Sequence, residues 1–145
     1  MRRSIIVVED NPADSRMLKM ALARRDSTIA TLVIDDGADA LKFFSSHADT
    51  LPCDLILLDL NLPRVSGFEI LEFLKSHPQL KRTPVIVLSG SSTQQDVERC
   101  YRTGANCYIC KPTGLDAVFT MIDDLIRYWF EQAQLPTVAA SVRMN

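Results

Sequence analysis

Short apolar runs alternate five times with segments of helical periodicity along this chain. The apolar runs are SIIVV (4–8), TIATLVI (28–34), DLILL (54–58), PVIVL (84–88) and NCYIC (106–110). Short runs of this kind, bounded by turn-forming residues, predict buried β-strands. The segments between them are NPADSRMLKMALARR (11–25), ADALKFFSS (38–46), GFEILEFLKSH (67–77), QQDVERCYRT (94–103) and LDAVFTMIDDLIRYWF (115–130). Apolar residues three or four positions apart in these segments predict a helix after every strand.

Strands this apolar predict a sheet that is covered on both faces. Such sheets are parallel, because the helix after each strand crosses one face in a right-handed connection. The sequence therefore predicts an α/β fold, a doubly wound five-stranded parallel sheet with an extended last helix. We expect one domain over 1–134, since 145 residues of which 47% are hydrophobic suffice for one full core. Pro136 and the small residues after it predict a separate C-terminal tail over 135–145.

Polar side chains follow four of the five predicted strands, at the point where each strand ends. Glu9 and Asp10 follow the first strand, and Asp59 follows the third. Ser89 follows the fourth and Lys111 the fifth. The carboxyl ends of parallel strands form one edge of the sheet, where ligands bind in such folds, so we expect these side chains to converge. An acid at a strand end can also cap the next helix, and this alternative stays open for Asp10.

Three converging carboxylates need a positive partner, because two unit charges 4 Å apart repel by roughly 4 kcal/mol at a surface-like dielectric constant. Mg²⁺ is the candidate, since it binds a few carboxylate oxygens, retains waters and takes phosphate oxygens as further ligands. A carboxylate beside Mg²⁺, with an ammonium and a hydroxyl to receive phosphoryl oxygens, is suited to making and breaking an aspartyl phosphate. We therefore predict that Asp59 accepts phosphate and that Lys111 and Ser89 assist it.

Several stretches of the sequence resemble the receiver domain of two-component response regulators, which has a CheY-like, flavodoxin-like fold. They are IIVVEDN (5–11), LILLDLNLPRVSGFE (55–69), PVIVLSG (84–90) and CYICKP (107–112). The resemblance implies that Asp59 is the phosphoacceptor and that Asp10 binds Mg²⁺ directly. It also implies that Glu9 acts on the metal through water, and that the backbone carbonyl of Asn61 is a further ligand.

The same resemblance implies a conformational switch. Ser89 and Lys111 would grip the phosphoryl oxygens, and Tyr108 would be the aromatic switch residue. Ser89 stands where the family more often has Thr, a change that keeps the hydroxyl. We expect phosphorylation to bias a pre-existing equilibrium, in which Ser89 moves toward the phosphoryl group and Tyr108 turns inward behind it. An alternative for Tyr108 is an edge-strand aromatic that packs on the fourth helix.

The function implied by the resemblance is that of a stand-alone response regulator, phosphorylated by a histidine kinase and able to dephosphorylate itself, rather than an enzyme acting on other substrates. The last helix running into YWFEQAQLP (128–136) resembles the regulators of bacterial and cyanobacterial phytochrome kinases. One alternative is a haloacid-dehalogenase-type phosphatase, but that family carries D-x-D on its first strand, whereas here Asp59-x-Asn61 follows the third. Another is a phosphorylation-independent pseudo-receiver, but such chains typically lose an acid or the lysine, and this one has them all.

Charge and composition narrow the partners. A net charge of −2 and a pI near 5.6 leave no basic excess for a phosphate backbone, so we expect no nucleic-acid partner. The first apolar run, 5–8, is too short for a signal peptide or membrane span, so we expect a cytoplasmic protein without a membrane partner. Cys107 and Cys110 form a lone C-x-x-C without a second ligand pair, which favours reduced thiols over a zinc site.

Two expectations concern the end of the chain. We expect the Lys111–Pro112 bond to be cis, because the chain must turn sharply off the last strand while the ammonium enters the site. Tyr128, Trp129 and Phe130 lie about 100° apart around the last helix, so at least one ring must face away from the core. We expect these rings to form a homodimer interface with the fourth helix and fifth strand. Alternatively, the tail from Leu135 onward folds back over the exposed ring.

Overall fold

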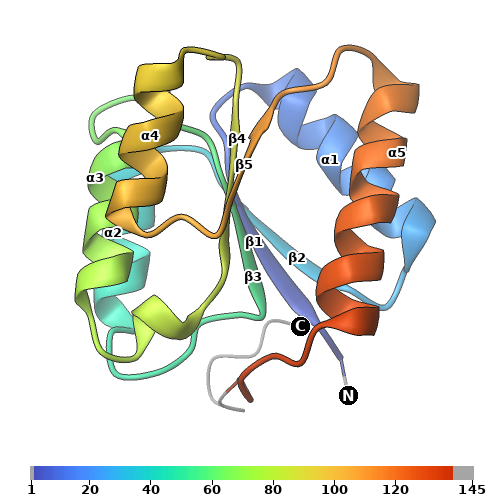
Figure 1. The fold of residues 1–145 in the computed structure, drawn as a ribbon. Helices are drawn as coiled ribbons and strands as arrows, with labels where there is room; N and C mark the ends of the chain where they lie inside the picture. Colours follow the sequence, from blue (N-terminus) through green and yellow to red (C-terminus); the bar gives the residue numbers. More distant parts are fainter. Residues whose placement is uncertain (1, 139–145) are drawn as a thin grey trace.

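A five-stranded parallel sheet forms the centre of the computed structural model, which describes residues 2–138 (Figure 1). The strands are β1 (Ser4–Val8), β2 (Ala30–Ile34), β3 (Leu55–Leu58), β4 (Val85–Ser89) and β5 (Cys107–Cys110), in the spatial order β2-β1-β3-β4-β5. All neighbouring pairs are parallel. The predicted fold class is thus confirmed, and β1 and β3, which precede the three acids, lie side by side.

Helices cover both faces of the sheet, as the apolar strands predicted. The helices α1 (Pro12–Arg25) and α5 (Leu115–Ile126) lie on one face, and α2 (Gly37–Ser46), α3 (Gly67–Ser76) and α4 (Gln94–Thr103) lie on the other (Figure 1). Successive strand residues face opposite layers: Ile5 and Val7 pack in the core with α1 and α5, whereas Ile6 and Val8 pack in the core with α2 and α3. The alternation follows from the two-residue period of a strand.

Polar caps fix where the helices begin at the carboxyl edge of the sheet. The Asn11 side chain accepts hydrogen bonds from the N–H groups of Ala13 and Asp14, and so starts α1 two residues after β1 and its acids. Asp36, Ser66 and Thr93 cap α2, α3 and α4 in the same way. At the far end of α4, Gly104 adopts a left-handed φ of 115° and ends the helix.

The last helix departs from the continuous α-helix expected to 130. Its α-helical hydrogen bonding ends at Ile126, and a π-helical segment (η2, Arg127–Gln132) follows, closed by Ala133 N–H donating to the Tyr128 carbonyl at 2.8 Å. Trp129 and Phe130 are half-buried and pack against the core shared by α1 and α5, whereas Tyr128 is 55% exposed. One of the three rings therefore faces solvent, as the helical geometry required.

The structure also bears on the predicted tail and on the predicted absence of a membrane span. The described part of the tail, 135–138, leaves Tyr128 exposed, and the rest of the tail, 139–145, lies outside the described residues. Between residues 2 and 138, no helix combines the length and the apolar character needed to cross a membrane.

Candidate functional site

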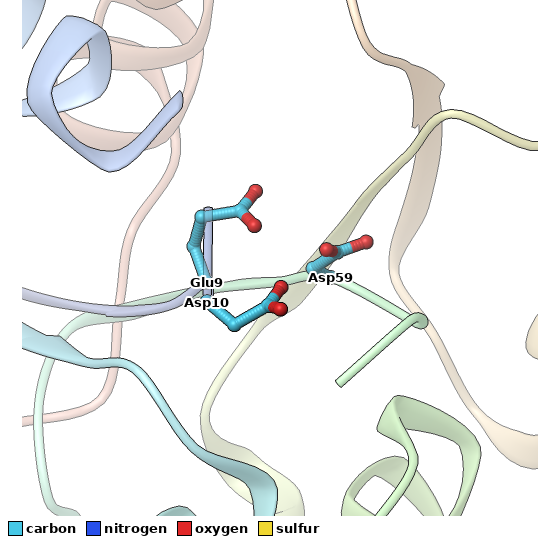
Figure 2. A group of neighbouring side chains, drawn as sticks. All are labelled: Glu9, Asp10 and Asp59. Atoms are coloured by element: carbon cyan, nitrogen blue, oxygen red, sulfur yellow. The ribbon is translucent and has the colours of Figure 1, made fainter. Parts of the chain in front are cut away.

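The three predicted acids converge at the carboxyl edge of the sheet. Carboxylate oxygens of Glu9, Asp10 and Asp59 all lie within 4.8 Å of one another. Figure 2 shows the three side chains gathered around a common space, with Asp10 reaching toward Asp59. Glu9 and Asp59 are buried, at 2% and 4% exposure, while Asp10 is open to solvent. The site is thus a buried acidic pair with a third carboxylate at its entrance.

Lys111 supplies the positive charge of this site. Its backbone N–H donates to the Ser89 carbonyl at 2.8 Å, which ties the end of β5 to the end of β4. The ammonium lies 2.6 Å from Glu9 Oε1 and 3.3 Å from Asp59 Oδ2. It also lies 3.0 Å from Asp14 Oδ2, a contact that the sequence interpretation missed. Burial lowers the pKa of Lys111, but hydrogen bonds to Glu9 and Asp14 outweigh that effect and hold the pKa above its usual value.

Glu9 is the acid whose protonation is most affected by its surroundings. The pKa of Glu9 is raised to about 7, mainly because burial raises it more than hydrogen bonds from Lys111 and from the Asn11 N–H at 3.1 Å lower it. Negative charge on the nearby Asp59 raises it further. Burial and the charge of Asp59 therefore disfavour the ionised form of Glu9, and a cation bound at the site would favour that form.

The donor set fits a hard divalent cation. Three carboxylates from two adjacent strand ends are oxygen ligands of the kind Mg²⁺ takes, and the exposure of Asp10 leaves room for metal-bound water. The Asn61 N–H donates to Asp59 Oδ1 at 3.4 Å, which places Asn61 beside the acids. Gly67 explains the tight return of the loop: its N–H donates to the Leu60 carbonyl, and a Cβ there would overlap the Asp59 carbonyl oxygen.

Ser89 and Tyr108 meet through the backbone of Ser91, which the sequence interpretation did not single out. Ser89 is fully buried, and its Oγ accepts a hydrogen bond from the Ser91 N–H at 3.2 Å. The Tyr108 hydroxyl donates to the Ser91 carbonyl at 2.9 Å, and the half-buried ring packs against the core next to α4. One residue of the β4–α4 loop therefore contacts both predicted switch residues.

The expected cis bond after β5 is wrong. No peptide bond within the described range 2–138 is cis, so Lys111–Pro112 is trans. The sharp turn was thought necessary to aim the ammonium, yet Lys111 reaches Glu9 and Asp59 with a trans bond. No disulfide joins the four cysteines, all of which are free thiols.

Two charged residues near the site carried no recognisable motif. Asp14 is in the first turn of α1, and its position at the carboxyl edge of the sheet was the available signal. Arg64, in the β3–α3 loop, has a left-handed φ of 67° and donates from Nε and Nη2 to both oxygens of Asp36, at 2.9 and 2.7 Å. The latter arrangement depends on how two loops fold against each other, so no local sequence pattern predicts it.

Comparison with known proteins identifies the family. The family sequence model described as "Response regulator receiver domain" matches residues 5–123, which is most of the chain. This chain belongs to the response regulator receiver domain family. Response regulator Rcp1 of Synechocystis sp. is 36% identical to it over 135 residues, covering 91% of this chain and 92% of Rcp1. Receiver domains are signalling proteins that work with histidine kinases, and the haloacid-dehalogenase alternative is therefore set aside.

Solved receiver structures agree in fold and in metal chemistry. The phosphorylated cyanobacterial phytochrome response regulator RcpA is 38% identical and superimposes with a TM-score of 0.88, covering 94% of this chain and all of RcpA. The Mn²⁺-bound form of Rcp1 is 36% identical with a TM-score of 0.84, covering 93% and 99% of the two chains. The receiver domain of sensor histidine kinase PA1611 from Pseudomonas aeruginosa, 25% identical with a TM-score of 0.71 and covering 89% and 98%, holds Mg²⁺ in its active-site cleft. Both metal-bound structures agree with the predicted Mg²⁺ cofactor, for which Glu9, Asp10 and Asp59 form the acidic cluster of this chain.

Proposed function

We propose that this receiver domain accepts a phosphoryl group on Asp59 from a histidine kinase and later hydrolyses it. The observation that carries the proposal is the placement of Asp59, a buried carboxylate 3.3 Å from the Lys111 ammonium and grouped with Glu9 and Asp10. In this arrangement the Asp59 carboxylate can attack phosphorus. The lysine and a metal ion held by the acids can neutralise the charge of the transferred group.

The transfer balances as a substitution at phosphorus. An Asp59 carboxylate oxygen attacks the phosphorus, the new O–P bond forms, and the P–N bond to the donor histidine breaks, with the imidazole leaving. Lys111 donates to one phosphoryl oxygen, and Ser89 donates its hydroxyl to another. Asp10, Asp59 and the Asn61 carbonyl would hold Mg²⁺, with Glu9 acting through water, and the bound ion would supply positive charge that neutralises the phosphoryl oxygens. In the later hydrolysis, a water oxygen attacks the phosphorus and the O–P bond to Asp59 breaks. Inorganic phosphate and the free Asp59 carboxylate are the products.

Phosphorylation then changes a protein-interaction face. The added charge of about −1.5 to −2 attracts the Ser89 hydroxyl hydrogen, and we propose that the Ser89 Oγ, which accepts the Ser91 N–H, draws the Ser91 backbone with it. Because the Ser91 carbonyl holds the Tyr108 hydroxyl, a shift of this loop reaches the exposed side of β5 and α4. The Ser91 backbone is the physical link we propose between Asp59 and Tyr108.

The partner we propose is a phytochrome-type histidine kinase in the cytoplasm. The support is the similarity over nearly the whole chain to RcpA, a phytochrome response regulator. In this proposal residues 1–134 form the receiver and 135–145 a separate tail, and no nucleic acid takes part. Phosphotransfer profiling, with this chain offered to a set of purified phosphorylated kinases, tests it: a phytochrome kinase should transfer fastest, and preference for another class contradicts the partner.

The experiment that tests the phosphoacceptor is intact mass spectrometry after incubation with acetyl phosphate and Mg²⁺. The wild-type chain should gain one phosphate, and removing Mg²⁺ with EDTA should abolish the gain. Asp59→Asn should gain none, because the amide cannot act as the nucleophile, and Asp49→Asn serves as a control acid outside the site. Phosphorylation of Asp59→Asn at the wild-type rate would show that another residue accepts the phosphate.

A further inference from the structure

Asp14 is the acid near Lys111 that the predicted site does not include. Its Oδ2 lies 3.0 Å from the Lys111 ammonium, closer than the 3.3 Å from the ammonium to the proposed nucleophile Asp59. The two side chains are 30% and 24% exposed, so the contact is partly shielded from water. It joins the first turn of α1 to the end of β5, across 97 positions of sequence.

The Asp14 carboxylate is not engaged in capping its own helix. In a capping box, the acid at the third helical position reaches back to the N–H of the cap residue. Here that N–H, on Asn11, is bonded by Glu9 Oε2 at 3.1 Å instead, while the Asn11 side chain receives the Asp14 N–H at 3.1 Å. Glu9 has taken over the capping bond, and the Asp14 side chain points to Lys111.

Asp14 also lies outside the group of acids that can hold the cation, which contains Glu9, Asp10 and Asp59. Two of the three carboxylates that the Lys111 ammonium contacts, Glu9 and Asp59, belong to that group. The ammonium and a divalent cation therefore draw on the same two carboxylates. Of the three carboxylates, Asp14 alone contacts Lys111 without also belonging to the group that could bind the metal.

We propose that Asp14 is a positioning residue for Lys111: it holds the ammonium at the α1 side of the site, limits its competition with Mg²⁺, and keeps it aimed at the phosphoryl position. The inference rests on the proposed role of Lys111 in phosphoryl transfer. Without Asp14, the ammonium relies on Glu9 and Asp59 alone, and it opposes metal binding more strongly. In a protein without Asp14, metal binding to the other acids leaves no carboxylate to hold the ammonium in place, and phosphoryl transfer slows.

A competing explanation is that Asp14 acts only through its position in the helix. An acid in the first turn of any helix is favoured by the helix dipole, and it adds negative charge near the metal. The neighbouring Ala13 is exposed and in the same turn, which offers a matched control. The double variant Ala13→Asp/Asp14→Ala keeps the first-turn charge and the net charge of the protein, but removes the acid from the position that contacts Lys111.

The test compares wild type, Asp14→Ala, Asp14→Asn and the double variant by calorimetric titration with Mg²⁺ alone. We expect Asp14→Ala to weaken Mg²⁺ binding about three- to tenfold, the range for loss of a partly buried charged hydrogen bond. Asp14→Asn, which keeps an acceptor without the charge, should fall between, and the double variant should stay as weak as Asp14→Ala. Affinity within twofold of wild type in Asp14→Ala, or recovery in the double variant, would overturn the proposal.

A second measurement separates positioning from metal binding. Phosphorylation by acetyl phosphate is followed at saturating Mg²⁺, where differences in metal affinity no longer matter. We expect the maximal rate of Asp14→Ala to fall about three- to tenfold as well, with thermal unfolding used to verify that each variant is folded. A wild-type maximal rate in Asp14→Ala would contradict the aiming role. Failure of the wild-type chain itself to gain phosphate would instead refute the proposed function, while the Mg²⁺ titration would still decide the role of Asp14.

Discussion

At the scale of single residues, the site combines groups with separable tasks. Asp59 and Lys111 face each other directly, whereas Ser89 is fully buried and makes its side-chain bond with the loop, not with Asp59. We expect the Ser89 hydroxyl to turn toward a phosphoryl group on Asp59 while Asp59 and Lys111 keep their positions. Chemistry and switching should therefore respond differently to substitution of Ser89.

Removing the Ser89 hydroxyl should uncouple phosphorylation from the conformational change. Ser89→Ala should still accept phosphate on Asp59, because the nucleophile, Lys111 and the acids remain. The ratio of active to inactive phosphorylated protein should fall about ten- to 150-fold, since a charged hydrogen bond contributes roughly 1.5–3 kcal/mol. NMR signals of the Tyr108 ring report that ratio, and Ser92→Ala is a control in the same loop. An active population equal to wild type in Ser89→Ala would contradict the coupling.

At the scale of elements, the β3–α3 loop carries Asn61 and is held against the start of α2. Gly37 N–H donates to the Pro63 carbonyl at 3.3 Å, and a Cβ at Gly37 would overlap the Val65 carbonyl oxygen. Arg64 adds a two-pronged ion pair with Asp36, and that bond to Arg64 holds the pKa of Asp36 at about 2, well below its usual range. The left-handed φ of 67° at Arg64 costs about 1–2 kcal/mol for a residue other than glycine, which the ion pair helps to offset.

Loosening this loop should weaken metal binding through Asn61. We expect Arg64→Ala to reduce Mg²⁺ affinity about two- to fivefold, because alanine keeps the backbone strain without the ion pair. Arg64→Gly should lose less, since glycine adopts a positive φ without that cost. Asp36→Asn is the matched partner variant, because it keeps the cap of α2 and removes the charge. Calorimetric titration with Mg²⁺ measures all three, and equal affinity in Arg64→Ala and wild type would mean that the backbone contacts alone hold the loop.

At the scale of the whole molecule, the face of α4, β5 and α5 is the surface on which we propose that two copies associate. A groove of about 560 Å³ runs between β5 and α5 there, lined by Cys107, Ile109, Met121, Leu125, Tyr128 and Trp129 among others. Tyr128, at 55% exposure, lies at this groove and is one of the most exposed large hydrophobic residues of the described chain. Tyr108 is on β5 itself, with its ring packed on the α4 side, so a change in its position would alter the α4 side of this face.

Light scattering at micromolar concentration tests the association. The wild-type chain should show about twice its 16.2 kDa mass, and Tyr128→Asp should shift it toward the monomer by placing an unpaired charge in the contact. Met20→Asp, which alters another exposed hydrophobic residue on α1, should leave the mass unchanged. A monomer both with and without the phosphoryl analogue beryllofluoride would exclude the dimer.

The sequence by itself determined the elements and the convergence of the acids, because both follow from short-range rules. Strand and helix periods are local, and parallel strands bring the residues after them to one edge, so Glu9, Asp10 and Asp59 had to meet once the sheet was parallel. Helix ends at Asn11 and Gly104 followed equally from backbone preferences of single residues.

Tertiary structure decided what depends on side-chain direction and on contacts between distant segments. The bond of Asp14 to Lys111 and the contacts of the Ser91 backbone with Ser89 and Tyr108 follow from how separate elements pack. The sequence also left open which of the three adjacent rings faces solvent. In the folded protein it is Tyr128, in the π-helical segment. The sequence period determines which face of an element is apolar. A contact between side chains 97 positions apart in the sequence, such as Asp14 and Lys111, forms only when the core is packed.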